Sequence, residues 1–406
     1  MDLRRHVPLL LLLGIAGGCV PAGPEVGGPR PEPPRRAAEE PAREPEPSAA
    51  ERPAVLGVVL PLSGSPYLKQ YADLVLEGVQ LAVEEGEQGG RSRVELVVLD
   101  DGGDPARSSA LVRELESRGA VAVIGPVLST GVAAAAGARS DSSLALLSPT
   151  ASEVPAGQAH VYSLNVSDEE GGVALAEYAV AAGLRRVALL YPKLPDFERQ
   201  ARAFAAALTA RGGQVVADVP YDSGTTTFEQ PLKQIGERSP DAIYIPAPER
   251  DVRQIAPQIE YYGVRQLGVQ VLGSEAWTRE EVRRLVDPRY LEGVVAATPL
   301  LQTSSEVGWR EFVALYEQRY RRTLDNPFPA LGYDATRLVL EALRSGGAER
   351  AEVARRIAET RGLRGSTGIL SVQAGRLVRR PFLVRIQGRE LVPIGRGAAP
   401  AGWGGV

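Results

Sequence analysis

The chain is poor in the residues from which most nucleophilic and metal sites are built. Its 406 residues include one cysteine, Cys19, and two histidines, His6 and His160. This scarcity removes Cys–His and Ser–His nucleophilic sites and any His/Cys metal cluster. Neither a G-x-x-x-x-G-K-[ST] loop nor a G-x-G-x-x-G fingerprint occurs. The sequence therefore predicts no enzyme, no cofactor and no metal, although a pair of carboxylates could still catalyse a reaction.

Aromatic residues and an excess of charge are also scarce. Aromatic residues make up 5% of the chain, which argues against a sugar receptor that stacks its ligand on rings. The formal net charge of -4 argues against a nucleic-acid partner, because such proteins need a concentrated basic surface. The hydrophobic share of 44% is ordinary for a globular protein and too low for a polytopic membrane protein.

Residues 1–18 have the layout of a secretory signal. Arg4 and Arg5 precede the short apolar run Val7–Ile15, which is too short to span a bilayer, and three small residues follow it. Cys19 comes next, and this order resembles a bacterial lipobox, in which the cysteine is acylated. The alternative is an ordinary signal followed by a chance cysteine. A lipobox predicts an extracytoplasmic protein held at a membrane by its acyl chains.

The segments that flank the folded part have little apolar content. Residues 19–53 carry the anchor and a linker rich in Pro, Glu, Arg, Ala and Gly, which cannot bury enough surface to fold. Residues 396–406, rich in Gly and Ala, predict a disordered tail. Val20 rather than Asp follows Cys19, which favours the periplasmic face of the outer membrane over that of the inner membrane.

Between these segments, short apolar runs alternate with segments of helical periodicity. Two successive series of this kind predict an α/β protein made of two doubly wound parallel-sheet lobes. The runs that predict strands are Val55–Leu60, Val94–Leu99, Val121–Ile124, Leu144–Leu147, Val187–Tyr191, Gln214–Val219, Ala242–Ile245, Val269–Leu272 and Val294–Ala297. Ser167 and Glu170 form a predicted capping box at the first helix of the second series.

Six motifs, in order along the chain, resemble the type I periplasmic binding proteins, and among them the Leu/Ile/Val receptor group. The motifs are Gly57–Gly64, Leu99–Pro105, Val123–Ser129, Leu147–Ser152, Gly273–Glu275 and Gly332–Ala335. The resemblance extends from about Val55 to Ile394. The sequence also resembles, as the alternative within this fold, the related domain of the lipoproteins that activate penicillin-binding proteins.

The resemblance implies that the chain crosses three times between the lobes. The crossovers are expected near Ser163–Ser167, Ala297–Leu301 and Gly368–Val372. Lobe 1 would then hold residues 54–165 with 299–367, and lobe 2 residues 166–298 with 369–395. The sequence pattern alone does not assign the last strands to either lobe.

Ligands of open parallel sheets lie beyond the carboxyl ends of the strands, and polar residues gather there in this sequence. Ser129 begins an alanine-rich helix, whose N-terminus favours an anion, although the serine could simply cap the helix. The resemblance implies that Ser129 and the loop Thr150, Ala151 and Ser152 bind an amino acid's carboxylate and ammonium. It implies that Glu275 faces the ammonium. A local turn and an exposed glutamate are the alternatives.

Four further residues are candidates for lining the pocket. Tyr71 and Tyr333 offer an apolar ring with a polar tip, and each could instead be a half-buried helix residue. Asp196 and Phe197 stand where the receptor group commonly has an aromatic residue followed by glycine. Either Phe197 closes over the ligand, or Asp196 points into the cleft and favours a cationic or polar ligand.

These observations lead to two hypotheses about function. The first is a receptor that closes its lobes around an amino acid-like zwitterion and delivers it to an ABC permease. The second is a lipoprotein that regulates a peptidoglycan synthase, a penicillin-binding protein, through its surface. The candidate cleft residues favour the first, and the reach of the long linker favours the second.

Overall fold

The computed structural model describes residues 53–88, 94–344 and 348–396. The predicted signal peptide, Cys19 and nearly all of the linker lie outside the described residues, as does the predicted tail except for Arg396. Arg396 is the last residue of a strand and forms an ion pair with Glu306, so this residue belongs to the folded part. Within the described ranges, no helix has both the length and the apolar character needed to cross a membrane.

The first sheet is fully parallel and has the strand order β2-β1-β3-β4-β5. Its strands are β1 (Ala54–Leu60), β2 (Val94–Asp100), β3 (Ala122–Ile124), β4 (Ala145–Ser148) and β5 (Val161–Ser163). Hydrophobic clusters cover both of its faces, which explains why these strands are continuous apolar runs rather than alternating ones. The short β5 was not expected from the sequence.

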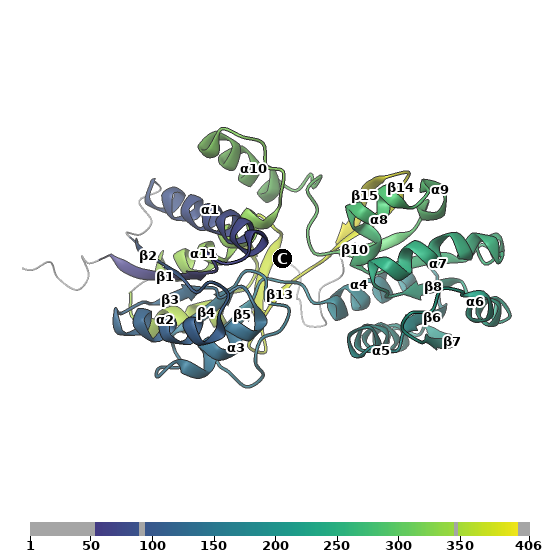
Figure 1. Ribbon diagram of the computed structural model, residues 1–406, viewed down its shortest axis with the longest axis horizontal. Coiled ribbons are helices and arrows are strands. Elements are labelled where there is room, and N and C mark those ends of the chain that lie inside the picture. Colours follow the sequence, from purple (N-terminus) through teal and green to yellow (C-terminus); the bar gives the residue numbers. More distant parts are fainter. Residues whose placement is uncertain (1–52, 89–93, 345–347, 397–406) are drawn as a thin grey trace, which may run out of the picture. The chain divides into compact units, whose positions relative to one another are not determined.

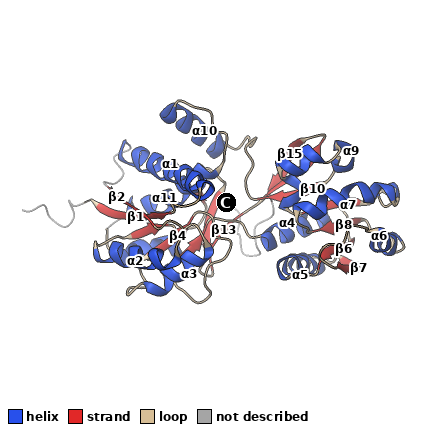
Figure 2. Cartoon of the chain, viewed as in Figure 1, coloured by secondary structure: helices blue, strands red, loops and turns tan. Residues whose placement is uncertain are grey.

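Six helices pack around the first sheet (Figures 1 and 2). They are α1 (Pro66–Gln88), α2 (Pro105–Ser117), α3 (Ser129–Ala138), α10 (Val307–Tyr320), α11 (Phe328–Arg344) and α12 (Arg350–Ala358). Helices α1 and α11 approach so closely that a Cβ at Gly78 would lie 1.8 Å from the carbonyl oxygen of Pro329. Asp104 caps α2 by accepting a hydrogen bond from the N–H of Ala106, as its sequence predicts.

The second sheet has the strand order β15-β14-β10-β9-β8-β6-β7. Five of its strands are parallel: β6 (Arg186–Pro192), β7 (Gln214–Tyr221), β8 (Ala242–Ile245), β9 (Gln270–Gly273) and β10 (Val295–Thr298). Strands β14 (Phe382–Gln387) and β15 (Glu390–Arg396) extend this sheet as an antiparallel edge. A sheet of this kind is a doubly wound sheet with an added hairpin.

Helices cover both faces of the second sheet (Figure 1). They are α4 (Asp168–Ala181), α5 (Pro195–Ala210), α6 (Glu229–Gly236), α7 (Glu249–Tyr261), α8 (Glu280–Leu285) and α9 (Pro288–Leu291). The capping box predicted from Ser167 and Glu170 is confirmed at the start of α4, where each side chain bonds the other's backbone N–H. The α/β fold class predicted from the sequence is confirmed.

A small third sheet, β11-β12-β13, corrects the expected place of the third crossover. Its strands are β11 (Leu363–Arg364), β12 (Ile369–Gln373) and β13 (Arg376–Arg379). Leu370, Val372 and Leu377 are buried in the same hydrophobic cluster as the first sheet. The chain therefore reaches the second sheet only after β13, at 380–381, and not near Gly368–Val372. We call the elements packed on the first and third sheets the first lobe, and those on the second sheet the second lobe.

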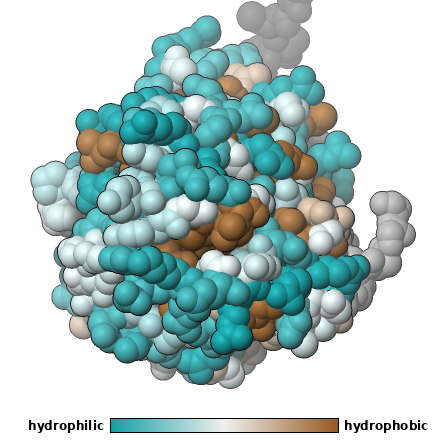
Figure 3. Space-filling view, turned by 90° about the vertical axis from the view of Figure 1, so that its right-hand side faces the viewer, coloured by the Kyte–Doolittle hydropathy of each residue, from teal (hydrophilic) through white to brown (hydrophobic). Residues whose placement is uncertain are grey.

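The surface is a mixture of charged side chains of both signs. Arginines pair with nearby carboxylates along several helices, for example Arg202 with Glu198 and Arg355 with Glu359. The face drawn in Figure 3 is largely hydrophilic, with a hydrophobic area near its centre and a few hydrophobic residues elsewhere. The many arginines are therefore part of a solvated surface rather than of one basic patch.

Candidate ligand-binding site

Ser129 lies in the first turn of α3 but does not cap this helix. The N-cap is Leu128, and no side-chain cap hydrogen bond is formed there among the described residues. The Ser129 hydroxyl oxygen lies 3.1 Å from that of Ser152 and accepts a hydrogen bond from the N–H of Glu153. An uncapped helix N-terminus with a hydroxyl beside it provides donors for a carboxylate.

The loop after β4 runs beside Ser129, and its three predicted residues differ in their surroundings. Thr150 is half-buried, and its hydroxyl donates to the carbonyl of Val127 at 3.2 Å. Ala151 is 1% exposed, and both its N–H and its carbonyl are bonded within the lobe, to Ser148 and Ser163. Ser152 is exposed. The structure thus brings Thr150 and Ser152 to the surface near Ser129 and packs Ala151 inside.

A cavity of about 710 Å³ is lined by residues of both lobes. Tyr71 and Thr150 of the first lobe and Glu275 of the second contribute to its wall. Its volume is in the range of small-molecule sites. Three of the residues predicted from the sequence therefore meet at one cavity.

Glu275 begins a short 3-10 helix, η2 (Glu275–Thr278), directly after β9. One carboxylate oxygen accepts from the Arg279 guanidinium at 3.1 Å, and the side chain is 26% exposed. Desolvation raises the pKa of Glu275, and the charge of Arg279 opposes this effect. A carboxylate held in such a place is stabilised by a cationic group of a ligand.

The two tyrosines predicted to line the pocket have different positions. Tyr71 packs edge-on against Phe328, with ring centroids 4.5 Å apart, and lines the cavity. Its hydroxyl is buried and has no hydrogen-bond partner among the described residues. Tyr333 is 3% exposed in the core of the first lobe, packs against Phe312 and donates to Glu85. Tyr333 is thus a core residue rather than a pocket residue, because its side of α11 faces α1.

Asp196 and Phe197 lie in the first turn of α5, and their side chains also have different surroundings. Asp196 is exposed and accepts a hydrogen bond from Arg199 at 2.7 Å. Phe197 is half-buried and lines a recess of the second lobe together with Glu275 and Asp168. Of the two alternatives at this position, the aromatic side chain is the one that lines a recess together with Glu275, a residue predicted to bind the ligand.

Sequence reasoning missed Asp168 and Gln200, which line this recess, and Tyr244, which lines a small chamber that shares Asp168 with it. Asp168 follows the capping serine of α4, and its position just after a crossover is a signal that could have been used. Gln200 and Tyr244 come from α5 and β8, and nothing in their neighbouring sequence distinguishes them from core residues.

A buried arginine bonds to segments at the crossovers between the lobes. Arg379, the last residue of β13, is 3% exposed and donates to the carbonyls of Leu164, Pro299 and Thr367. Leu164 follows β5, and Pro299 follows β10, so these carbonyls belong to the first two crossovers. Burial, together with the charge of Arg396, lowers the pKa of Arg379 to about 10. The guanidinium therefore links all three crossing segments.

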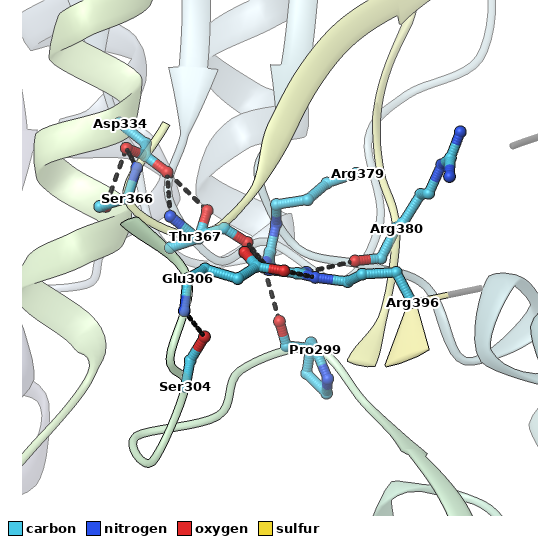
Figure 4. Close-up of polar contacts among 9 residues, drawn as sticks. All are labelled: Pro299, Ser304, Glu306, Asp334, Ser366, Thr367, Arg379, Arg380 and Arg396. Carbon is cyan, nitrogen blue, oxygen red and sulfur yellow. Dashed lines mark hydrogen bonds and ion pairs between the residues drawn. The ribbon is translucent and has the colours of Figure 1, made fainter. Parts of the chain in front are cut away.

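Two further groups complete this hydrogen-bonded network (Figure 4). Arg396 pairs with Glu306 at 2.6 Å and donates to the carbonyl of Arg380 at 2.7 Å. The buried carboxylate of Asp334 accepts hydrogen bonds from the backbone and hydroxyl groups of Ser366 and Thr367. The segment that carries Thr367 is thereby fixed to α11.

The model of one protein family, described as periplasmic binding protein, matches residues 53–390. The chain belongs to the periplasmic binding protein family. The match extends from β1 to the first residue of β15, so it includes Arg379 and most of both lobes, while Arg396 lies beyond it. No curated protein matches the sequence.

Solved structures share the fold of this periplasmic binding protein. A Rhodospirillum rubrum protein assigned to branched-chain amino acid ABC transport has 24% identity and a TM-score of 0.75, and the alignment covers 84% of this chain and 100% of the other. LivJ of Streptococcus pneumoniae, a branched-chain amino acid transporter substrate-binding protein in complex with isoleucine, has 22% identity and a TM-score of 0.58, with 85% and 100% covered. An ABC transporter solute-binding protein from R. palustris in complex with benzoate has 21% identity and a TM-score of 0.55, with 86% and 97% covered.

Both lobes of this periplasmic binding protein contribute polar groups at the cavity or next to it. In the part of the chain that the structure describes, no three His, Cys, Asp or Glu side chains are grouped to hold a metal ion. The first lobe offers hydroxyl and N–H donors around Ser129, and the second offers carboxylates around Glu275. This arrangement can hold a molecule that carries a carboxylate at one end and a cation at the other.

Proposed function

We propose that the protein is an extracytoplasmic, lipid-anchored receptor that binds an amino acid or a similar small zwitterion and delivers it to an ABC permease. The anchor would be Cys19, at the end of the signal-like segment. The linker to residue 53 would hold the receptor away from the membrane.

The distribution of hydrogen-bonding groups at the cavity and next to it is the observation that carries this proposal. Thr150 and Glu275 line the cavity, whereas Ser129 is not a lining residue and follows Leu128, which is one. The uncapped N-terminus of α3, with Ser129 and nearby Ser152 and Thr150, provides donors for the ligand's carboxylate. Glu275, from the other lobe, provides an acceptor for its ammonium. Because opposite ends of the ligand need groups from different lobes, a bound ligand stabilises the closed arrangement of the lobes.

The ligands of two related structures are compatible with this arrangement. Isoleucine and benzoate differ in size and shape, and each carries a carboxylate. This shared group supports the carboxylate site at α3, whereas the remainder of the cavity would set the preference for one ligand over another.

A thermal-shift screen of the purified protein against amino acids and small carboxylates tests this function. A ligand present at 100 times its Kd stabilises the folded state by about 2.7 kcal/mol, which raises the melting temperature by several degrees. Ser129→Ala is expected to weaken binding about tenfold, because a hydrogen bond to a charged carboxylate is lost. Ser117→Ala, at an exposed serine of α2, is the matched control and leaves binding unchanged.

One outcome of the thermal-shift screen would contradict the proposed receptor function. If no amino acid or small carboxylate raises the melting temperature, the receptor function is wrong. Co-purification of a penicillin-binding peptidoglycan synthase in the same preparation would then favour the regulator hypothesis.

A further inference from the structure

The second lobe contains a recess that extends beyond the residues proposed to bind the zwitterion. An open part of about 460 Å³ is lined by Asp168, Gln200, Ser274 and Glu275, among others. A second, much smaller chamber of about 10 Å³ is lined by Tyr244 and again by Asp168, Ser274 and Glu275. This small chamber has the size of one water molecule or one nitrogen group. Because three residues line both spaces, the chamber and the open recess adjoin.

Two buried polar atoms at this recess have no partner. Tyr244 is 0% exposed and stacks on Phe204 at 4.3 Å, and its hydroxyl has no hydrogen bond among the described residues. Gln200 is 2% exposed, and its amide nitrogen donates to Asp168 at 3.1 Å, while its amide oxygen has no partner. Buried polar atoms are nearly always hydrogen-bonded, so two such atoms at one recess indicate a group that the apo chain does not supply.

Arg250 and Arg279 also line the recess, and the charge of Arg279 acts on Asp168, but among the described residues the Asp168 carboxylate forms no ion pair. Glu275 pairs with Arg279 at 3.1 Å, and Glu169 pairs with Arg199 at 3.1 Å. In the described part of the chain, no arginine or lysine nitrogen lies within 4.0 Å of the Asp168 carboxylate. Desolvation raises the pKa of Asp168, and the charge of Glu169 adds to this effect. An acid at a helix start is stabilised by the helix dipole, but the dipole gives no partner to Tyr244 or Gln200.

We propose, on the basis of the function proposed above, that this recess binds a second cationic nitrogen of the ligand. The preferred ligands are then amino acids with an ammonium or guanidinium side chain, and not aliphatic ones. An ammonium group has three donors and no acceptor. The Asp168 carboxylate offers it an acceptor at the wall of both spaces. The Gln200 amide oxygen and the Tyr244 hydroxyl oxygen are buried from solvent, and they would become two further acceptors only when a nitrogen group or a water enters between them and Asp168.

Calorimetric titration of the purified protein with L-lysine, L-arginine and L-norleucine tests this preference. Norleucine matches the length of lysine but lacks its terminal ammonium, so the pair isolates the contribution of the charge. Lysine or arginine is expected to bind at least about tenfold more tightly than norleucine, as is typical of a hydrogen-bonded charge in a desolvated site.

Two substitutions test whether the preference for a cationic side chain depends on Asp168 and Tyr244. Asp168→Asn keeps an oxygen for the Gln200 N–H and is expected to weaken lysine binding about tenfold or more, while norleucine binding changes by less than about twofold. Tyr244→Phe is expected to weaken lysine binding without lowering the melting temperature of the apo protein, since the hydroxyl has no partner there. Asp222→Asn, at an exposed residue paired with Lys193, is the control and changes neither affinity.

The outcomes separate this inference from the proposed function. If norleucine binds as tightly as both lysine and arginine, or if Asp168→Asn leaves the binding of both cationic amino acids unchanged, the cation site is overturned and the receptor function stands. If the protein binds none of these amino acids, nor any other tested in the thermal-shift screen, both are overturned.

Discussion

Replacing Asp334 by alanine is expected to lower the free energy of unfolding by about 3–5 kcal/mol. The Asp334 side chain is 0% exposed, and its two oxygens accept four hydrogen bonds of 2.5–2.8 Å from Ser366 and Thr367. Alanine removes the acceptor and leaves two backbone N–H groups and the Thr367 hydroxyl unpaired in a buried site, while the Ser366 hydroxyl keeps the carbonyl of Ala330 at 3.3 Å. Urea unfolding monitored by circular dichroism measures the change.

A surface aspartate provides the control for this substitution. Asp73 is exposed and forms an i,i+4 ion pair with Lys69 on α1, so Asp73→Ala is expected to cost less than about 0.5 kcal/mol. A loss at Asp334 as small as the loss at Asp73 would contradict the account, because it would mean that the 366–367 segment does not depend on this carboxylate.

Replacing Arg379 by methionine is expected to destabilise the protein by about 2–4 kcal/mol and to loosen the segments that join the lobes. Methionine retains an unbranched apolar stem but cannot donate to the carbonyls of Leu164, Pro299 and Thr367. The carbonyls of Leu164 and Pro299 lie at the first two crossovers, so the expected change is local as well as global. Hydrogen exchange should show faster exchange at residues 164–167 and 299–303 than in the unmodified protein.

Replacing Arg379 by lysine separates the contribution of the charge from that of the guanidinium's hydrogen-bond donors. Arg379→Lys keeps the charge but lacks the planar fork of donors, so it is expected to fall between the wild type and Arg379→Met. Arg253→Met, at an arginine paired with Glu281 on the surface, is the control, with an expected loss below about 1 kcal/mol. Equal exchange rates at both crossovers in Arg379→Met and the wild type would contradict the role given to Arg379.

The alternation of strands and helices could be predicted from the sequence because it depends on local patterns. The run Val55–Leu60 is apolar throughout since both faces of the first sheet are covered, and it appears as β1. Ser167 and Glu170 are three residues apart and form the capping box that this spacing predicts. Cys19 and the linker lie outside the described residues, so their assignment remains a prediction.

The arrangement of distant segments could not be predicted in the same way. The apolar pattern of Ile369–Val372 predicts a strand but not the sheet that it joins, and β12 packs with the first lobe. Tyr333 has the apolar ring and polar tip expected of a pocket residue. Its hydroxyl, however, donates a hydrogen bond to Glu85 of α1 in the packed interface between two helices. Tyr244 and Gln200 reach one recess from separate elements, and their missing hydrogen bonds are visible only when the chain is folded.

The binding of chemically blocked ligands tests the central claim most directly, namely that the two lobes hold opposite ends of a zwitterion. The amino acid with the largest thermal shift should be titrated against the protein beside its methyl ester and its N-acetyl derivative. Each derivative lacks one charge, and each is expected to bind at least about tenfold more weakly than the parent, because one charged hydrogen-bonding end is lost. Binding of both derivatives within about threefold of the parent, a difference of less than about 0.7 kcal/mol, would contradict the account.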